Sequence, residues 1–249
     1  MAKNRLITGL TRWCVPPFGM SAASAALVFC LTGCATSRDN NSSHAPNPNV
    51  AAHETNVELA PDTALARLVE GNRRFASGQA IHPDQSVERR AALAGGQSPF
   101  AVVLTCSDSR VAPELYFDQG LGDLFVLRNA GNILDDHTLG SIEYAVEHLH
   151  VRLIVVVGHE KCGAVSAALG GKPEPGHIQS ILDSIAPALG GVNDQPGDKL
   201  DTAVRANARR TSELLGRTGP ILEEAVKAGR LRVVAAKYDL AGGTVEILP

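Results

Sequence analysis

Aromatic residues make up only 4% of this chain of 249 residues, and methionine occurs only twice. A core with so few rings must be built from Val, Ile, Leu and Ala, which favours a parallel sheet buried by helices on both faces. The chain also lacks the excess of positive charge that a nucleic-acid partner requires, since 23 Lys and Arg stand against 26 Asp and Glu. We find no internal repeat. These absences favour an ordinary α/β domain and exclude a basic nucleic-acid-binding protein.

No apolar run near the N-terminus is long enough to cross a bilayer, which takes about 20 residues. Residues 1–34 instead have the features of an export signal. Three basic residues precede a short apolar stretch at 21–31, and the stretch runs into Leu31-Thr32-Gly33-Cys34. This tetrapeptide is similar to the lipobox of bacterial lipoproteins, which implies that Cys34 is acylated. The alternative is a plain secretory signal that is cleaved near Ala35.

The expected location follows from this signal. A lipid on Cys34 would anchor the exported chain to a membrane, facing the periplasm, and the lipid would be its only contact with the membrane. Ala35 follows the cysteine where an Asp is the usual signal for retention in the inner membrane, so we expect the outer membrane in a two-membrane bacterium. Residues 35–60 are rich in Asn, Ser, Ala, Pro and His, which predicts a flexible linker to a folded domain at 61–249.

The cysteine count separates the signal from the domain. Three of the five cysteines lie in residues 1–34, so only Cys106 and Cys162 belong to the folded region. An oxidising compartment would permit a disulfide between these two. The residues around each cysteine favour a metal site instead.

Apolar patterning in residues 61–249 predicts strands that alternate with helices. Strands are expected at 100–105, 123–128, 152–158, 231–239 and 244–248, the last two as a hairpin that turns at Gly242-Gly243. Helices are expected from caps at Asp62 and Thr63, at Ser86 and at Thr138, and over 176–190, 198–216 and 219–229. This alternation predicts a mostly parallel central sheet flanked by helices.

Three candidate metal ligands lie just beyond two of the expected strands. Cys106 directly follows the strand at 100–105, His159 directly follows the strand at 152–158, and Cys162 comes three residues later. Ligands bind open α/β sheets at these carboxyl ends of strands. Two thiolates and an imidazole are a donor set that selects zinc. The sequence therefore predicts one zinc ion per chain.

Asp108 and Arg110 leave two states of this site open. If Asp108 becomes a fourth ligand, the site is closed and anionic, as in a structural zinc site. If Arg110 binds the carboxylate, the fourth position is open to water and the site can be catalytic. Acidic pH should favour the closed form.

Five segments of the sequence resemble motifs of the β-class carbonic anhydrases. They are Cys106-Ser107-Asp108-Ser109-Arg110-Val111, the segments at 122–132, 140–145 and 158–163, and the G-N-x-x-F at 71–75. The resemblance covers about Asp62 to the C-terminus. It implies zinc ligation by Cys106, His159 and Cys162, a catalytic dyad of Asp108 with Arg110, and hydration of CO₂ to bicarbonate and a proton by zinc-bound hydroxide.

The resemblance also carries finer expectations. Gln97 and Gly163 would contact substrate, and Gln97 matches the constitutively open branch of the family. Phe75 stands where the bicarbonate-inhibited branch has Trp, which favours the same branch. Members are homodimers or larger assemblies in which the first helix packs on the partner. Two alternatives remain: a noncatalytic zinc protein that senses bicarbonate, and a hydrolase of carbonyl sulfide or carbon disulfide on the same fold.

Overall fold

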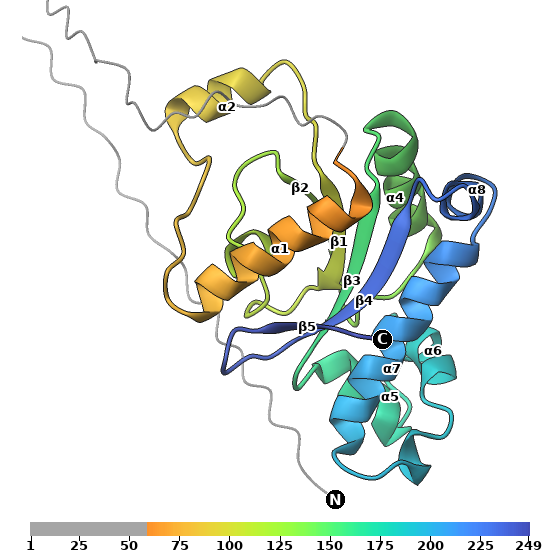
Figure 1. Ribbon diagram of the computed structural model, residues 1–249. Helices are drawn as coiled ribbons and strands as arrows, with labels where there is room; N and C mark the ends of the chain where they lie inside the picture. The colour runs from red at the N-terminus through yellow and green to blue at the C-terminus, as the bar shows by residue number, and fades with distance from the viewer. Residues whose placement is uncertain (1–58) are drawn as a thin grey trace, which may run out of the picture. The chain divides into compact units, whose positions relative to one another are not determined.

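Five strands form a single sheet in the order β2-β1-β3-β4-β5 in the computed structural model, which describes residues 59–249 (Figure 1). β1 to β4 pair in parallel, and only the short β5 is antiparallel, to β4. The strands are β1 (Ala101–Cys106), β2 (Leu124–Asn129), β3 (Leu153–His159), β4 (Arg232–Tyr238) and β5 (Val245–Ile247). This sheet and its terminal hairpin confirm the predicted α/β class.

Eight α-helices are described in residues 59–249, and several of them connect the strands. They are α1 (Pro61–Ala76), α2 (Val87–Leu93), α3 (Pro113–Tyr116), α4 (Asp136–His148), α5 (Gly163–Gly170), α6 (Ile178–Ile185), α7 (Lys199–Arg217) and α8 (Ile221–Lys227). Two short 3₁₀ helices, η1 (Ala186–Ala188) and η2 (Val192–Asp194), lie between α6 and α7. None of these described helices is long and apolar enough to cross a membrane.

The central strands β1 and β3 are buried on both faces. Side chains alternate between the faces of a strand, so Val103 and Val155 enter one core, which α1 and α7 also line. Leu104 and Ile154 enter a second core on the other face, together with residues of α4 and α8. All thirteen residues of these two strands are buried, as the continuous apolar runs predict.

The strand β2 differs from its prediction. Its apolar run was expected to form a buried strand, but β2 lies at the edge of the sheet, with β1 on one side and no other strand of residues 59–249 on the other. Five of its six residues are only partly buried and Arg128 is exposed. An apolar run does not indicate whether a strand is central or lies at the edge of its sheet.

The predicted cap of α2 is confirmed, whereas the predicted caps of α1 are not. Ser86 caps α2 and accepts a hydrogen bond from the Arg89 N–H at 3.1 Å, as predicted. The expected caps Asp62 and Thr63 are wrong, because α1 already begins at Pro61 with Ala60 as its N-cap. Proline suits the first helical position, since its ring presets the helical φ and the missing N–H has no partner there.

The predicted start of α4 and the predicted end of α6 are also wrong. The cap of α4 is Asp135, whose carboxylate accepts from the Thr138 N–H at 2.7 Å, so Thr138 is in the first turn and is not the cap. The helix expected at 176–190 ends at Ile185 and continues as the 3₁₀ helix η1. Pro187 lies in that segment and lacks the N–H that an α-helix would need.

A buried carboxylate fixes the segment that connects α1 to α2. Asp118 accepts a hydrogen bond from Arg74 Nε at 2.6 Å and further bonds from the backbone N–H groups of Ile81 and His82. Burial by itself would raise the pKa of Asp118, but these donors lower it overall. The carboxylate is therefore charged in the folded chain near neutral pH.

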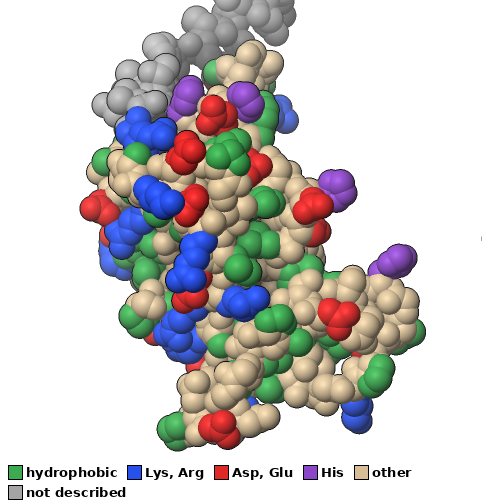
Figure 2. Space-filling model, turned by 90° about the vertical axis from the view of Figure 1, so that its right-hand side faces the viewer, with side chains coloured by type: hydrophobic (Ala, Val, Ile, Leu, Met, Phe, Trp, Pro, Cys, Tyr) green, Lys and Arg blue, Asp and Glu red, His purple; other side chains and the backbone are tan. Residues whose placement is uncertain are grey.

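The face of the molecule that bears α4, α7 and α8 carries mixed charge. Figure 2 shows Lys and Arg side chains along one side of this face with acidic side chains among them. On α7, Arg205 bonds both Glu246 oxygens, at 2.8 and 2.7 Å, and on α8, Lys227 lies 2.7 Å from Glu223. This face therefore has no continuous basic surface.

The expected signal peptide at 1–34, with Cys34, lies outside the described residues. So does the expected linker at 35–60, apart from its last two residues.

Candidate metal centre

Three side chains meet at the carboxyl ends of β1 and β3. Cys106 is the last residue of β1, His159 is the last residue of β3, and Cys162 is the N-cap of α5. Their candidate ligand atoms all lie within 4.8 Å of one another, and all three residues are buried. β1 and β3 are neighbours in the sheet, so their ends bring the first two residues together. The structure thus assembles the predicted group.

The ring of His159 has one nitrogen engaged and one without a partner. Nδ1 lies 2.8 Å from the carbonyl oxygen of Glu160. Because a carbonyl can only accept, Nδ1 carries the proton and Nε2 carries the lone pair. Nε2 is buried and has no hydrogen-bond partner. A metal ion is the partner that such a lone pair beside two thiols would fit.

Each of the two thiols shifts the pKa of the other. A hydrogen bond from Cys162 and smaller contributions from His159 and the Gly131 N–H lower the pKa of Cys106 to about 4. The bond to Cys106 and burial raise the pKa of Cys162. Cys106 is therefore a thiolate when it meets a cation, and Cys162 would lose its proton on binding, because ligation requires the thiolate.

A strained turn brings Cys162 back toward His159. Lys161 has a positive φ of 53°, which is uncommon for a residue with a side chain. The preceding Glu160 is fixed to β4, since its N–H donates to the Tyr238 carbonyl at 3.0 Å. This turn therefore lets two ligands with the H-x-x-C spacing face the same point.

Asp108 lies beside the group but is held by Arg110. Arg110 donates from Nε to Oδ1 at 2.9 Å and from Nη2 to Oδ2 at 2.7 Å, and its backbone N–H adds a bond of 3.0 Å to Oδ1. The hydrogen bonds from Arg110 hold the pKa of Asp108 well below its usual range. Oδ2 is also 3.9 Å from His159 Nε2. The carboxylate is thus close enough to interact with a metal while its oxygens are bound elsewhere.

Three residues around the centre received no role from the sequence. Arg128 donates from Nε to the Cys106 carbonyl at 3.0 Å and from Nη2 to the Asp108 carbonyl at 2.6 Å. Gly131 donates its N–H to Cys106 Sγ at 3.4 Å, and Asn207 of α7 donates to the Gly131 carbonyl at 2.8 Å. Arg128 and Gly131 lie in the motif at 122–132. The only sequence signal for Asn207 is a polar residue on a buried helix face.

The two residues expected to contact substrate lie in different places. Gly163 is the exposed first residue of α5, next to Cys162, and a side chain there would meet no atom within 4 Å. Gln97 is exposed and precedes β1, whereas Cys106 ends β1. Six residues of strand span about 20 Å. Gln97 is therefore at the opposite end of the strand from the metal group of its own chain.

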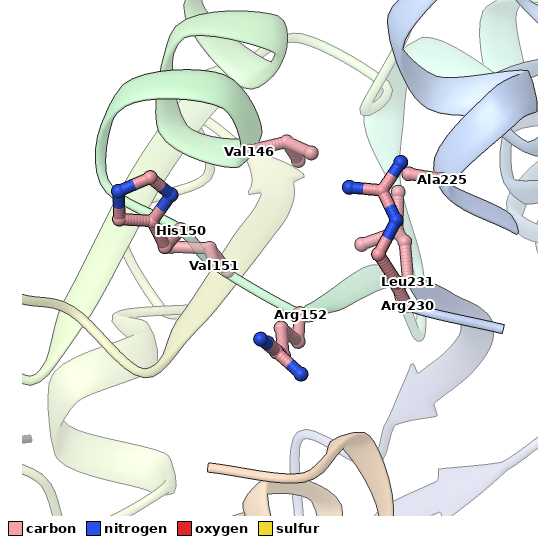
Figure 3. Close-up of a pocket in the computed structure, with 7 residues that line it drawn as sticks. All are labelled: Val146, His150, Val151, Arg152, Ala225, Arg230 and Leu231. Atoms are coloured by element: carbon pink, nitrogen blue, oxygen red, sulfur yellow. The ribbon is translucent and has the colours of Figure 1, made fainter. Parts of the chain in front are cut away.

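A pocket at the amino ends of β3 and β4 is not part of this centre. Figure 3 shows His150, Arg152 and Arg230 at its rim, with Val146 of α4 and Ala225 of α8. Arg230 comes shortly after the C-terminal end of α8, where a positive side chain complements the helix dipole. The pocket is separated from the metal group by the length of the strands.

The chain is similar to carbonic anhydrases over the whole of this site. The sequence model of the carbonic anhydrase family matches residues 101–245. Carbonic anhydrase 2 of Mycobacterium tuberculosis is 43% identical over 187 residues, which cover 74% of this chain and 90% of that protein. The carbonic anhydrase of Mycolicibacterium smegmatis is 42% identical over 191 residues, covering 75% and 93%.

Solved structures agree in fold. One of two tetrameric β-carbonic anhydrases from the filamentous ascomycete Sordaria macrospora superposes with a TM-score of 0.61 at 27% identity. The match covers 74% of this chain and 96% of that one.

Proposed function

The chain belongs to the β-class carbonic anhydrases, and we propose that Asp108 and Arg110 together gate its metal centre. It is a zinc enzyme that catalyses the reversible hydration of carbon dioxide to bicarbonate and a proton. Zinc supplies a Lewis acid that ionises water near neutral pH. Cys106, His159 and Cys162 would hold the ion.

The unpartnered Nε2 of His159 between two thiols is the observation that carries the metal assignment. These three side chains would supply three ligands to zinc, the number that protein residues supply in catalytic zinc sites, in which water or substrate takes the fourth position. Asp108 is the nearby group that could take that position. A closed Cys₂HisAsp site would hold zinc but would have no room for water.

Arg110 supports the open state. Its guanidinium and its backbone N–H occupy both oxygens of Asp108, and a carboxylate in this bidentate pairing is a poor metal ligand. The same carboxylate is negative and lies 3.9 Å from His159 Nε2, so it could accept a hydrogen bond from a water molecule held beside the metal and orient it. We propose that Asp108 turns toward the metal only when this pairing is lost.

The experiment that tests the function is stopped-flow CO₂ hydration by the purified full-length chain, with its zinc content measured at each pH. We expect activity that rises from about pH 7 to about pH 9 as the open form and ionised water prevail. A zinc-replete chain with no hydration anywhere in this range would support the structural-zinc alternative instead.

We also propose that the enzyme works as a homodimer or larger assembly. The outer edge of β2 offers unpaired backbone groups, which proteins normally cover. α2 buries none of its residues in the single chain, and Val69 and Val87 are 48% and 64% exposed. A partner chain would cover these surfaces and could receive Gln97, which cannot reach its own metal group. Light scattering on the parent chain and on the Val69→Lys variant tests the assembly, and the variant should have the lower mass. A monomeric parent chain would contradict the proposal.

Export and lipid anchoring are a separate proposal that rests on Leu31-Thr32-Gly33-Cys34. The acylated Cys34 would hold the enzyme at the periplasmic side of the outer membrane. Cys34→Ser should release a soluble chain or leave an unprocessed precursor. Fractionation of the host cells, with metabolic labelling by a fatty acid, measures both results. Recovery of the native chain from the cytosol would refute the proposal.

A further inference from the structure

Arg128 connects the edge strand to the loop that carries the dyad. It lies near the end of β2, opposite Thr105 of β1 in the parallel register. Its Nε donates to the carbonyl of Cys106 at 3.0 Å and its Nη2 donates to the carbonyl of Asp108 at 2.6 Å. One side chain therefore binds the backbone carbonyls of both Cys106, a candidate metal ligand, and Asp108, the proposed gating residue.

The contacts require the shape of a guanidinium. The two acceptors are carbonyls two residues apart, and Arg128 reaches them with two N–H groups in a fixed planar arrangement. A Lys ammonium is a compact group on a flexible chain and cannot keep this geometry. A backbone hydrogen bond also ties this loop to β2, since the Ser107 N–H donates to the Asn129 carbonyl at 3.1 Å. The segment from Cys106 to Asp108 is thus tied to β2 at three points.

This attachment fixes the start of the Asp108 side chain. Arg110 holds the carboxylate, and Arg128 together with the Val111 N–H, at 3.1 Å, holds the carbonyl of the same residue. A carboxylate swings toward the metal most easily if its own backbone can also move. Fixing the carbonyl removes that movement and leaves the pairing with Arg110 as the favoured arrangement.

We propose that Arg128 is a positioning residue that keeps Asp108 paired with Arg110 and off the metal. The inference rests on the proposed gating by Asp108. It assigns Arg128 no contact with substrate or metal. The competing explanation is that Arg128 only ties β1 to β2, in which case its loss would lower stability and leave the centre unchanged.

The test compares Arg128→Ala and Arg128→Lys with a matched control, Arg205→Ala. Arg205 also makes several guanidinium hydrogen bonds, to Asp201 and Glu246. Glu246 lies on β5, at the opposite edge of the sheet from β2. Four quantities are measured on full-length zinc-loaded and cobalt-substituted protein: kcat, KM, the visible spectrum of Co²⁺ and the thermal midpoint.

We expect Arg128→Ala to lower kcat roughly tenfold to a hundredfold with little change in KM. Its cobalt spectrum should shift toward that of Arg110→Ala, in which Asp108 has lost its other partner. Guanidinium ion at low concentration should restore part of the kcat. Arg128→Lys should show the same spectral shift, so the test remains possible if the alanine variant does not fold. Arg205→Ala should lower only the thermal midpoint.

The positioning role is refuted if Arg128→Ala and Arg128→Lys keep the parent kcat and cobalt spectrum and lose only stability. Failure of the proposed function would look different. In that case the parent chain itself would lack CO₂ hydration, whereas the cobalt spectrum would still report whether Arg128 moves Asp108.

Discussion

The Nδ1 atom of His159 lies 2.8 Å from the carbonyl oxygen of Glu160, its immediate neighbour in the chain. The bond sets both the tautomer and the direction of the ring, and it leaves Nε2 for a metal. Because the acceptor is a backbone atom, any residue type could provide it at position 160. The side chain of residue 160 can therefore vary without loss of the centre.

Glu160→Ala should accordingly retain about one zinc per chain, because the bond to His159 uses the backbone carbonyl. The side chain of Glu160 accepts only a long bond of 3.4 Å from the Leu240 N–H, so stability should change little. Cys162→Ser removes a ligand and should lose both the metal and much of the stability, since binding and folding are coupled. Metal analysis and thermal unfolding of the two variants check this. Metal-free Cys162→Ser with full activity would contradict the ligand assignment.

Arg110→Ala should keep its zinc while CO₂ hydration falls by orders of magnitude, because Asp108 is then free to close the site. Asp108→Asn should also keep zinc. It should impair the reaction for another reason, since an amide cannot orient the attacking water as a carboxylate does. Metal content and stopped-flow rates are measured on the same samples. Full activity of zinc-loaded Arg110→Ala would overturn the gating mechanism.

Asp118 should contribute to the pH dependence of stability. Its folded-state pKa is lowered by Arg74 and two backbone N–H groups against the effect of burial. Its contribution is therefore present above the ordinary Asp pKa of about 3.9 and is lost as the pH falls from there through the lower pKa of the folded state. Asp118→Asn should cost roughly 1–3 kcal/mol at neutral pH and less in acid. Urea unfolding of both chains at each pH gives the difference, in which the shared effect of metal loss cancels. A difference that is constant with pH would exclude this role.

Two helical glycines should respond in opposite directions to alanine. A Cβ on Gly71 of α1 would lie 1.8 Å from the Phe117 carbonyl oxygen, which is backbone and cannot move alone. Gly71→Ala should therefore destabilise the fold by about 1–3 kcal/mol or more. A Cβ on Gly140 of α4 would meet no atom within 4 Å, so Gly140→Ala should stabilise by about 0.5–1 kcal/mol. Chemical denaturation of the two variants checks both signs, and equal effects would show that the packing at Gly71 is not limiting.

The metal centre was predictable because its residues follow strands that the sequence makes plain. The runs before Cys106 and His159 are apolar without interruption, and parallel strands of a sheet end at the same edge. The short helix α3 and the strand order were not predicted. A four-residue helix has no periodicity to detect, and strand order depends on long-range pairing.

The remaining errors have local causes. Thr138 and Asp135 are both good capping residues, and only the structure shows which one precedes the helix. The contacts of Arg128 and Asn207 are with residues distant in the sequence, and a single sequence does not indicate which distant residues a side chain will reach. The prediction of β2 as a strand is confirmed, but its prediction as a buried strand is wrong, because an apolar run does not show which strands pair at the edge of the sheet.

The pairing of β1 with β3 runs from Val102 opposite Ile154 to Thr105 opposite Val157. A slip of one residue would move the sulfur of Cys106 by about 3.3 Å and turn it to the other face of the sheet, away from His159. The ion can therefore bind only to chains whose two central strands have aligned correctly. Metal uptake should therefore report on sheet assembly, and a zinc titration of refolded protein should count the molecules whose central strands are correctly paired.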